Sequence, residues 1–121
     1  MANIFLDANI IFDILIRNNK KATMVFGHIP FISPLSYHIL YYSQNIKVPH
    51  KTTIDPLKKM GIVNFTKKIL EQALVSPTND LEDNIQLHSA SKANCGFFLT
   101  DDKKLLKMKS FGKMKIVDKI T

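Results

Sequence analysis

Short continuous apolar runs, separated by longer stretches with helical spacing, make up most of the chain. Runs of this length are typical of strands that are buried on both faces of a parallel sheet. Strands that alternate with helices predict an α/β fold, here a three-layer α/β/α sandwich with a mainly parallel sheet of about five strands. We place the strands at Asn3–Leu6, Pro30–Ser33, Ile62–Phe65, Phe97–Leu99 and Met114–Val117.

Between these runs, apolar residues recur every three or four positions, as they do on one face of a helix. Helix starts are expected after the N-cap candidates Ser33, Asp55 and Thr66, and Gly96 is expected to end the helix before the fourth strand. Residues 45–53 are expected to form a basic connector. We place the helices at Ala8–Arg17, Lys20–His28, Pro34–Gln44, Asp55–Gly61, Lys67–Leu74, Asp80–Gly96 and Lys103–Lys109.

Acidic residues gather at the ends of two predicted strands and along one predicted helix. Asp7 follows the first strand, and Asp101 and Asp102 come shortly after the strand Phe97–Leu99. Five of the ten carboxylate side chains lie between residues 80 and 102, in a chain whose net charge is +7. Because the carboxyl ends of parallel strands meet at one edge of a sheet, we expect acids from all three places to converge there.

The acidic helix places Asp80, Asp83 and Asn84 on one face by their i, i+3 and i+4 spacing. Three converging carboxylates would repel one another without a cation, so the cluster predicts a site for Mg²⁺ or Mn²⁺. A cation of this kind can activate a water molecule and stabilise the developing charge of a phosphodiester. Thr100 then has two possible tasks, which are to position a phosphate or to hold an acid with its hydroxyl.

Each of these residues also has a purely structural alternative. Asp7 and Asp80 each stand just before a helix and fit an N-cap, and Asp83 fits an acidic first helical turn. Asn9 fits either a support for the site or a polar residue of the first turn. The four histidines show no metal-ligand spacing, so we expect His88, which lies among apolar helix residues, to be a satisfied interior or interface histidine.

Length and composition predict one folded domain over residues 1–121, because 45% of the residues are hydrophobic. The longest apolar run is too short to cross a membrane. The first residues lack the basic opening and the cleavage site of a secretion signal, and a single cysteine suits a reducing compartment. We therefore expect a cytoplasmic protein without a membrane segment, in which Cys95 is a small buried residue at a helix-to-strand turn.

The charge balance favours a polyanionic partner. Seventeen Lys and Arg residues against ten acids give a pI near 9.6. A basic surface attracts polyanions, of which nucleic acid is the most common, although solvated lysines that only keep a protein soluble are the alternative. Because the acids cluster while the lysines spread around them, we expect a nucleic acid as partner. The lysines in question are Lys58, Lys59, Lys67, Lys68, Lys103, Lys104, Lys107 and Lys109.

Taken in order, these segments resemble a PIN domain of the VapC-like kind, the toxin ribonucleases of bacterial toxin–antitoxin pairs. Residues 4–9 are similar to the opening strand and first acid of that family, and residues 80–87 to its acidic helix. Residues 98–102 are similar to its strand with a Thr-any-Asp ending. The resemblance covers essentially the whole chain, and the three motifs together carry it.

The resemblance implies that Asp7, Asp83 and Asp102 bind the metal and are the catalytic residues, with Asp102 rather than Asp101 directed inward. It also implies RNA as substrate, a cognate antitoxin that covers or fills the site, and a homodimer. Supporting residues are expected at Asn9, Asp80 and Thr100.

The chain departs from the family pattern at one position. The family usually carries a glutamate on the helix after its second strand, whereas residues 33–42 contain no acid. The expected position falls at about Ile39, beside His38, and a neutral histidine suits transition metals better than Mg²⁺. Three alternatives follow: three acids suffice, His38 takes a changed supporting role, or cleavage is lost while binding remains. We hypothesise a weaker dependence on Mg²⁺ and a preference for Mn²⁺.

The leading prediction from sequence is a metal-dependent endoribonuclease of PIN type that acts as the toxin of a toxin–antitoxin pair. The alternative is a PIN-fold module that binds RNA or a protein partner without cleavage, and the absent glutamate is its main support. A third reading, an acidic regulatory pocket without nucleic acid, does not account for the lysines.

Overall fold

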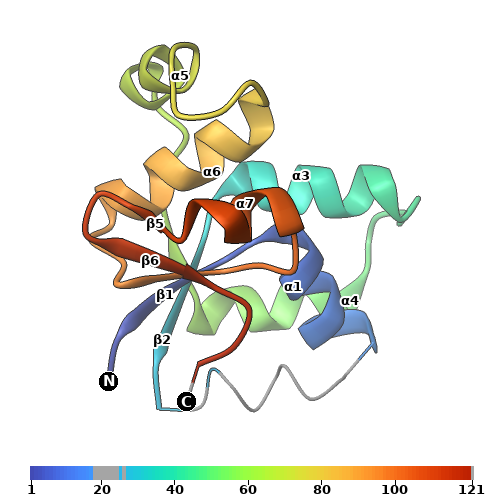
Figure 1. Cartoon of the computed structure of the whole chain (residues 1–121). Helices are drawn as coiled ribbons and strands as arrows, with labels where there is room; N and C mark the ends of the chain where they lie inside the picture. The colour runs from blue at the N-terminus through green and yellow to red at the C-terminus, as the bar shows by residue number, and fades with distance from the viewer. Residues whose placement is uncertain (18–24, 26, 121) are drawn as a thin grey trace.

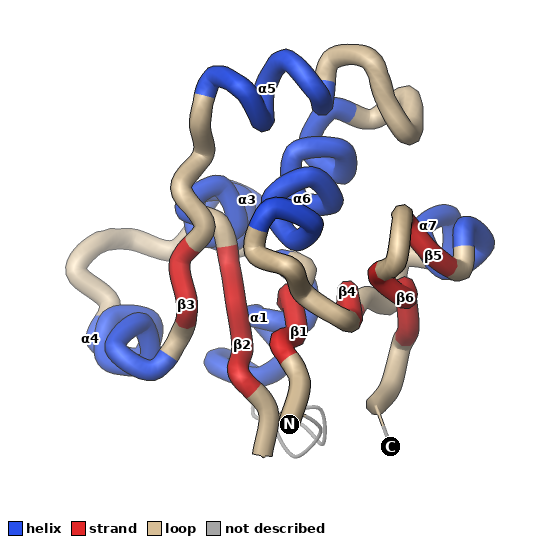
Figure 2. The backbone as a smooth tube through the Cα atoms, turned by 90° about the vertical axis from the view of Figure 1, so that its left-hand side faces the viewer, coloured by secondary structure: helices blue, strands red, loops and turns tan. Residues whose placement is uncertain are grey.

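A single sheet organises the protein, which we describe from a computed structural model for residues 1–17, 25 and 27–120. Its strand order is β3-β2-β1-β4-β6-β5, and Figure 2 shows the strands in this order across the molecule. Neighbouring strands run parallel except for β5 and β6, which are antiparallel at one edge. The strands are β1 Asn3–Leu6, β2 Ile29–Ile32, β3 Gly61–Ile62, β4 Phe97–Leu99, β5 Ser110–Phe111 and β6 Met114–Val117.

Helical segments cover both faces of this sheet. In both views α5 and α6 lie on the same side of the strands, with α6 next to the sheet and α5 beyond it (Figures 1 and 2). The segments are α1 Ala8–Phe12, the π-helical η1 Asp13–Arg17, α3 Pro34–Ser43, α4 Lys51–Ile54, the 3-10 segment η2 Asp55–Lys59, α5 Lys67–Ala73, α6 Leu81–Lys92 and α7 Lys103–Met108.

Alternation along the central strands creates two hydrophobic cores, one on each face of the sheet. Phe5 of β1 and Phe98 of β4 face α5, α6 and α7, and their rings stack with centroids 5.5 Å apart. Ile4 and Leu6 face the opposite side, where they pack with α1 and α3. Because both faces of β1 and β4 are buried, these strands are continuous apolar runs in the sequence.

The predicted α/β/α sandwich on a mainly parallel sheet is confirmed. The sheet has one strand more than expected, because the two-residue β5 pairs with β6 through a short hairpin whose turn contains Gly112 at φ +60°. The third strand is shorter than predicted and covers Gly61–Ile62 only. These differences concern the two edges of the sheet and leave its centre as predicted.

The expectations for the caps of α3 and α5 are confirmed, whereas that for Asp55 is wrong. Ser33 accepts a hydrogen bond from the Leu35 N–H at 3.2 Å, and Thr66 accepts one from the Ile69 N–H at 3.2 Å. Asp55 is not an N-cap but the first residue of η2, which follows directly on α4, and α4 begins within the predicted connector 45–53. The chain therefore enters this helical segment four residues earlier than the proline signal suggests.

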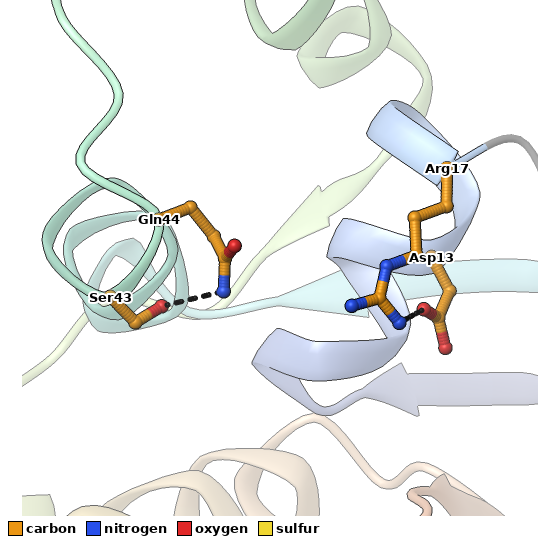
Figure 3. Close-up of polar contacts among 4 residues, drawn as sticks. All are labelled: Asp13, Arg17, Ser43 and Gln44. Atoms are coloured by element: carbon orange, nitrogen blue, oxygen red, sulfur yellow. Dashed lines mark hydrogen bonds and ion pairs between the residues drawn. The ribbon is translucent and has the colours of Figure 1, made fainter.

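The first helix changes its winding halfway, since α1 continues into a π-helical turn that carries a buried acid. Asp13 is 6% exposed, and its carboxylate pairs with the Arg17 guanidinium at 3.3 Å. Figure 3 shows these two side chains pointing toward each other, and also the contact between Ser43 at the end of α3 and Gln44, which follows it. Arg17 also lies 4.6 Å over the Phe12 ring. Asp13 is thus engaged by its own helix.

The acidic helix ends earlier than predicted. Its last residue is Lys92, and Asn94 adopts the left-handed conformation at φ +55° that a glycine would adopt most readily. Gly96 instead leads into β4, where its N–H donates to the Asn3 carbonyl. Cys95 between them is buried, as expected, and burial raises the pKa of its thiol to about 12.

Two further expectations concern the helix predicted after Arg17 and membrane-spanning segments. The predicted helix Lys20–His28 falls largely outside the described residues. Within the part of the chain that the structure describes, no helix combines the length and apolar character needed to cross a bilayer.

Candidate active site

The carboxyl ends of β1 and β4 bring two predicted site residues together. Leu6 and Leu99 are register partners in the parallel pair, so Asp7 and Thr100 follow at the same edge of the sheet. The backbone confirms the proximity, because the Asp7 N–H donates to the Leu99 carbonyl at 3.1 Å. Residues that are remote in the sequence thus become neighbours through strand pairing.

The Thr100 hydroxyl is the centre of a buried hydrogen-bond chain. It donates to Asp7 Oδ2 at 2.7 Å and accepts from the Asp102 N–H at 3.0 Å. Thr100 is fully buried, and Asp7 is 7% exposed. Of the two tasks considered for Thr100, the structure shows the second, which is to hold an acid.

Asp7 and Asp102 each cap a helix at this edge. Asp7 Oδ1 accepts from the Ala8 N–H at 2.7 Å at the start of α1, and Asp102 Oδ1 accepts from the Lys104 N–H at 2.8 Å at the start of α7. Asp7 therefore has the N-cap role considered as its structural alternative. Capping uses one oxygen of each carboxylate, so it does not exclude a second role.

The start of α6 contributes the other acids. Asp80 is its N-cap and accepts from the Asp83 N–H at 3.0 Å, which confirms the capping alternative for Asp80. Asn84, predicted on the same face, is only 3% exposed and is used structurally. Its amide donates to the Ala73 and Thr78 carbonyls at 2.8 and 2.9 Å, which fastens the loop between α5 and α6.

These elements enclose a cleft of about 500 Å³. Asp80 and Asp83 at the start of α6 and Asp102 after β4 share it with Lys104 of α7, so three acidic residues and one lysine line the same hollow. Its lining residues are Thr78, Asn79, Asp80, Asp83, Asp102, Lys104, Leu105 and Met108. Asp7 is not among them, but Thr100 joins it by hydrogen bonds to Asp102, which lines the cleft.

The acids influence one another electrostatically. Burial, followed by the charges of Asp80, Asp7, Asp102 and then Glu82, raises the pKa of Asp83 from 3.8 to about 7. This coupling shows that the carboxylates from β1, α6 and the β4–α7 junction lie within reach of each other's fields. Perturbation by burial together with specific charged neighbours is common at functional sites.

Asp7 is under opposing influences. Burial raises the pKa of its carboxyl, while hydrogen bonds from Thr100, Ala8 and Gln86 lower it and the charge of Asp102 raises it again. Burial is the largest cause, so the net direction is upward. An approaching cation would act in the opposite direction and favour the charged form.

The donor set suits a hard cation, although no ready-made ligand shell is present. Among the described residues, no three His, Cys, Asp or Glu side chains are grouped so that they could hold a metal ion as they stand. The cleft nevertheless presents carboxylate oxygens without imidazole or thiol, which is the chemistry that Mg²⁺ and Mn²⁺ prefer. The residues thus fit such an ion by charge and donor type.

The remaining supporting candidates, His38 and Asn9, do not line the cleft. His38 is exposed and stacks on Tyr42, with ring centroids 6.4 Å apart. It lines a separate hollow of about 270 Å³ together with Glu82 from α6. Asn9 is exposed on the first turn of α1. His88 is satisfied as expected, since its Nε2 lies 3.1 Å from the Ser76 carbonyl oxygen.

Gln86 is a site residue that the sequence analysis missed. It is 2% exposed on α6, one turn after Asp83, and it is among the groups that lower the pKa of the Asp7 carboxyl. A glutamine in a helix is commonly a surface residue, so its type gives no signal. Its spacing of three residues from Asp83 would place it on the same side of the helix, which is the only available clue.

No protein-family model matches the sequence, and a comparison with curated proteins finds no match. Solved structures do match. VapBC2 from Rickettsia felis, bound to a promoter DNA fragment, shares 17% identity over 95% of this chain and 97% of its own, with a TM-score of 0.63. A toxin–antitoxin complex from Klebsiella pneumoniae shares 18% over 84% and 88%, with a TM-score of 0.68.

A third match is VapC20 of Mycobacterium tuberculosis, described as a toxin that cleaves the sarcin–ricin loop. It shares 12% identity over 93% of this chain and 98% of its own, with a TM-score of 0.65. At such identities the likeness concerns the path of the backbone. This chain therefore has the PIN-type fold of the VapC toxins.

Proposed function

We propose that this protein is a metal-dependent endoribonuclease of PIN type that acts as the toxin of a toxin–antitoxin pair. The observation that carries the proposal is the placement of three acids that are remote in the sequence: Thr100 joins Asp7 to Asp102, and Asp102 lines the same cleft as Asp83. A fold shared with VapC toxins and carboxylates gathered at one sheet edge support a site that cleaves phosphodiesters.

In this proposal Asp7, Asp83 and Asp102 hold Mg²⁺ or Mn²⁺. When bound, the cation supplies a Lewis acid that activates water and stabilises charge on the phosphate. Thr100 keeps Asp7 in place, and Asp80 adds negative charge at the rim of the cleft. Lys104 from α7 lines the same cleft, where its ammonium group can attract an RNA phosphate.

The same proposal extends to location and partners. The similar solved structures include a toxin–antitoxin complex and VapBC2, which supports a cognate antitoxin for this chain. We further propose a homodimer in the cytoplasm, and RNA as the polyanion that the net charge of +7 attracts.

Asp7→Asn tests the catalytic assignment. The substitution keeps the size of the side chain but removes its charge, so we expect cleavage of structured RNA to fall by at least about 100-fold, as expected for loss of a catalytic group. Purified protein is incubated with RNA and Mg²⁺, Mn²⁺ or a chelator, and circular dichroism confirms folding. Asp55→Asn, an exposed acid on η2, is the matched control. Full activity in the Asp7 variant would remove the assignment.

The second candidate function is an RNA- or protein-binding module without cleavage. It is favoured by α3, which contributes no acid, and by His38, which lines a different hollow from the acidic cleft. The experiment above separates the two functions. If wild type and Asp7→Asn both bind RNA and neither cuts it with any cation, the binding module is correct.

A further inference from the structure

A second hollow lies between α5 and α6, which are on the same side of the sheet (Figures 1 and 2). It has a volume of about 370 Å³ and shares no lining residue with the acidic cleft. Its charged side chains are Lys68 from the first turn of α5 and Lys92 from the last turn of α6. Among the described residues, no Asp or Glu lines it. This hollow is therefore basic, whereas the cleft is acidic.

The polar side chains of this hollow can donate hydrogen bonds to an anion. The Thr66 hydroxyl oxygen accepts from the Ile69 N–H at 3.2 Å, which leaves the hydroxyl hydrogen for an outside acceptor. Gln72 and Ser91 add an exposed amide and an exposed hydroxyl. Ammonium groups combined with amide and hydroxyl donors suit the oxygens of a phosphate group.

The two lysines are not explained by ion pairs. Neither has an ion-pair partner among the described residues, and Glu71, one turn after Lys68 on α5, lies beyond ion-pair distance of it. Positive charge is unfavourable in the first turn of a helix, where Lys68 stands, whereas Lys92 suits the last turn of α6. Lys68 thus carries a charge from which its own helix gains no stability.

The basic lining continues beyond this hollow. Ser91 also lines a neighbouring hollow of about 320 Å³, together with Lys113 and Phe111. The Phe111 ring is half-buried and meets the His88 ring of the first hollow edge-on, with centroids 5.1 Å apart. Lysines beside aromatic rings are typical of surfaces that bind single-stranded nucleic acid, where bases pack on the rings. We call this the basic surface, and its members are Lys68, Ser91, Lys92, Phe111 and Lys113.

We propose that the basic surface binds phosphate groups of a single-stranded RNA outside the position where the acidic cleft acts. This inference rests on the function proposed above and adds a second contact for the same substrate. Asp83 in the first turn of α6 lines the cleft, and Lys92 in its last turn lines the basic surface. At a rise of about 1.5 Å per residue, about 14 Å of helix separates them. The acids of the cleft repel phosphates, so lysines nearby provide attraction that the cleft lacks.

The double variant Lys68→Gln/Lys92→Gln tests this surface. Affinity for a single-stranded RNA of about 12 nucleotides is measured by fluorescence anisotropy with a chelator present. Log affinity changes by about 0.7 per phosphate contact for each tenfold change in salt, so the loss of two contacts should weaken binding about 25-fold at about 0.1 M salt and hardly at all at about 1 M. The melting temperature should stay the same or rise, because a charge unfavourable to α5 is removed.

Lys58→Gln/Lys59→Gln, at exposed positions of η2, is the matched control, because it removes the same charge elsewhere. It should leave RNA affinity near that of wild type. Equal losses in the two double variants would mean that only net charge matters, which would overturn the proposal. Ser91→Glu is a second variant that places a negative charge on the wall shared by both hollows, and it should weaken RNA binding by about 5-fold or more.

Inorganic phosphate and cleavage assays distinguish the other outcomes. If calorimetry detects inorganic phosphate binding that Lys68→Gln/Lys92→Gln abolishes, while RNA affinity is unchanged, the surface binds small anions and the RNA assignment is wrong. If wild type cuts RNA and the double variant binds it as tightly as wild type, the proposed nuclease stands and this inference fails. If wild type cuts no RNA with any cation while the double variant still loses affinity, the nuclease fails and the RNA-binding surface stands.

Discussion

Asp83 is a half-buried acid of the cleft, and its protonation should be visible in the stability of the protein. Its folded-state pKa is about 7, against 3.8 for the free side chain. Between these values the folded state binds more protons than the unfolded state. Its contribution to stability is therefore fully present below about pH 4, falls as the pH rises, and is lost above about pH 7.

Asp83→Asn removes this contribution. We expect urea unfolding, measured with a chelator between about pH 4 and pH 8, to show a smaller loss of stability with rising pH in the variant than in wild type. Asp7, whose pKa is also raised, acts in the same direction and remains in the variant, so some loss persists. Asp55→Asn should follow wild type. Parallel curves for wild type and Asp83→Asn would contradict the coupling among the acids.

Among single residues, the sequence predicts the candidate site residues that come just after a strand. Asp7 and Asp102 stand directly after or close to buried apolar runs, which identifies them. Gln86 could not be predicted, because its role depends on how α6 packs on β1. Whether His38 replaces the missing glutamate also depends on packing, and its hollow with Glu82 lies apart from the cleft.

At the scale of elements, Asn84 is the residue that joins α5 to α6. Its side chain donates to the Ala73 and Thr78 carbonyls and accepts from the Thr78 N–H and hydroxyl. We expect Asn84→Ala to lower the free energy of unfolding by about 3 kcal/mol, because buried backbone groups lose their partners. Chemical denaturation measures this. The exposed Asn79 of the same loop is the control, and Asn79→Ala should change stability by less than about 0.5 kcal/mol.

The Asn84→Ala variant also tests whether the loop between α5 and α6 supports the acidic cleft. Asp80 begins α6 immediately after this loop, so loosening the loop should weaken cation binding by the cleft as well. Wild-type stability in Asn84→Ala would show that the loop does not depend on this side chain.

Elements with strong periodicity are predictable, whereas short ones at edges are not. The central strands and the caps at Ser33 and Thr66 follow from apolar runs and capping chemistry. The segment α4 is four residues long and has no apolar face in the sequence, so Asp55 and its proline gave the stronger but wrong signal. The two residues of β5 form a strand only because β6 is beside them.

At the scale of the whole molecule, the net charge of +7 predicts strong salt dependence of RNA binding. If about five phosphates are neutralised, affinity for single-stranded RNA should fall roughly 100-fold between 50 and 200 mM salt. Fluorescence anisotropy with a chelator present, to prevent cleavage, measures this.

In a plot of log affinity against log salt concentration, Lys104→Gln should reduce the slope by the equivalent of roughly one phosphate contact. Lys58→Gln, on η2, should leave the slope unchanged. An affinity that is independent of salt would mean that the basic surface does not bind the nucleic acid.

The position of β1 at the centre of the sheet has a consequence for synthesis. β1 is made first, yet its partner β4 and the Thr100 hydroxyl that holds Asp7 are separated from it by about ninety residues of chain. A growing polypeptide on the ribosome therefore carries Asp7 long before it carries Thr100 or Asp102. The acidic site comes into existence only when translation has passed residue 102, so incomplete products lack its chemistry.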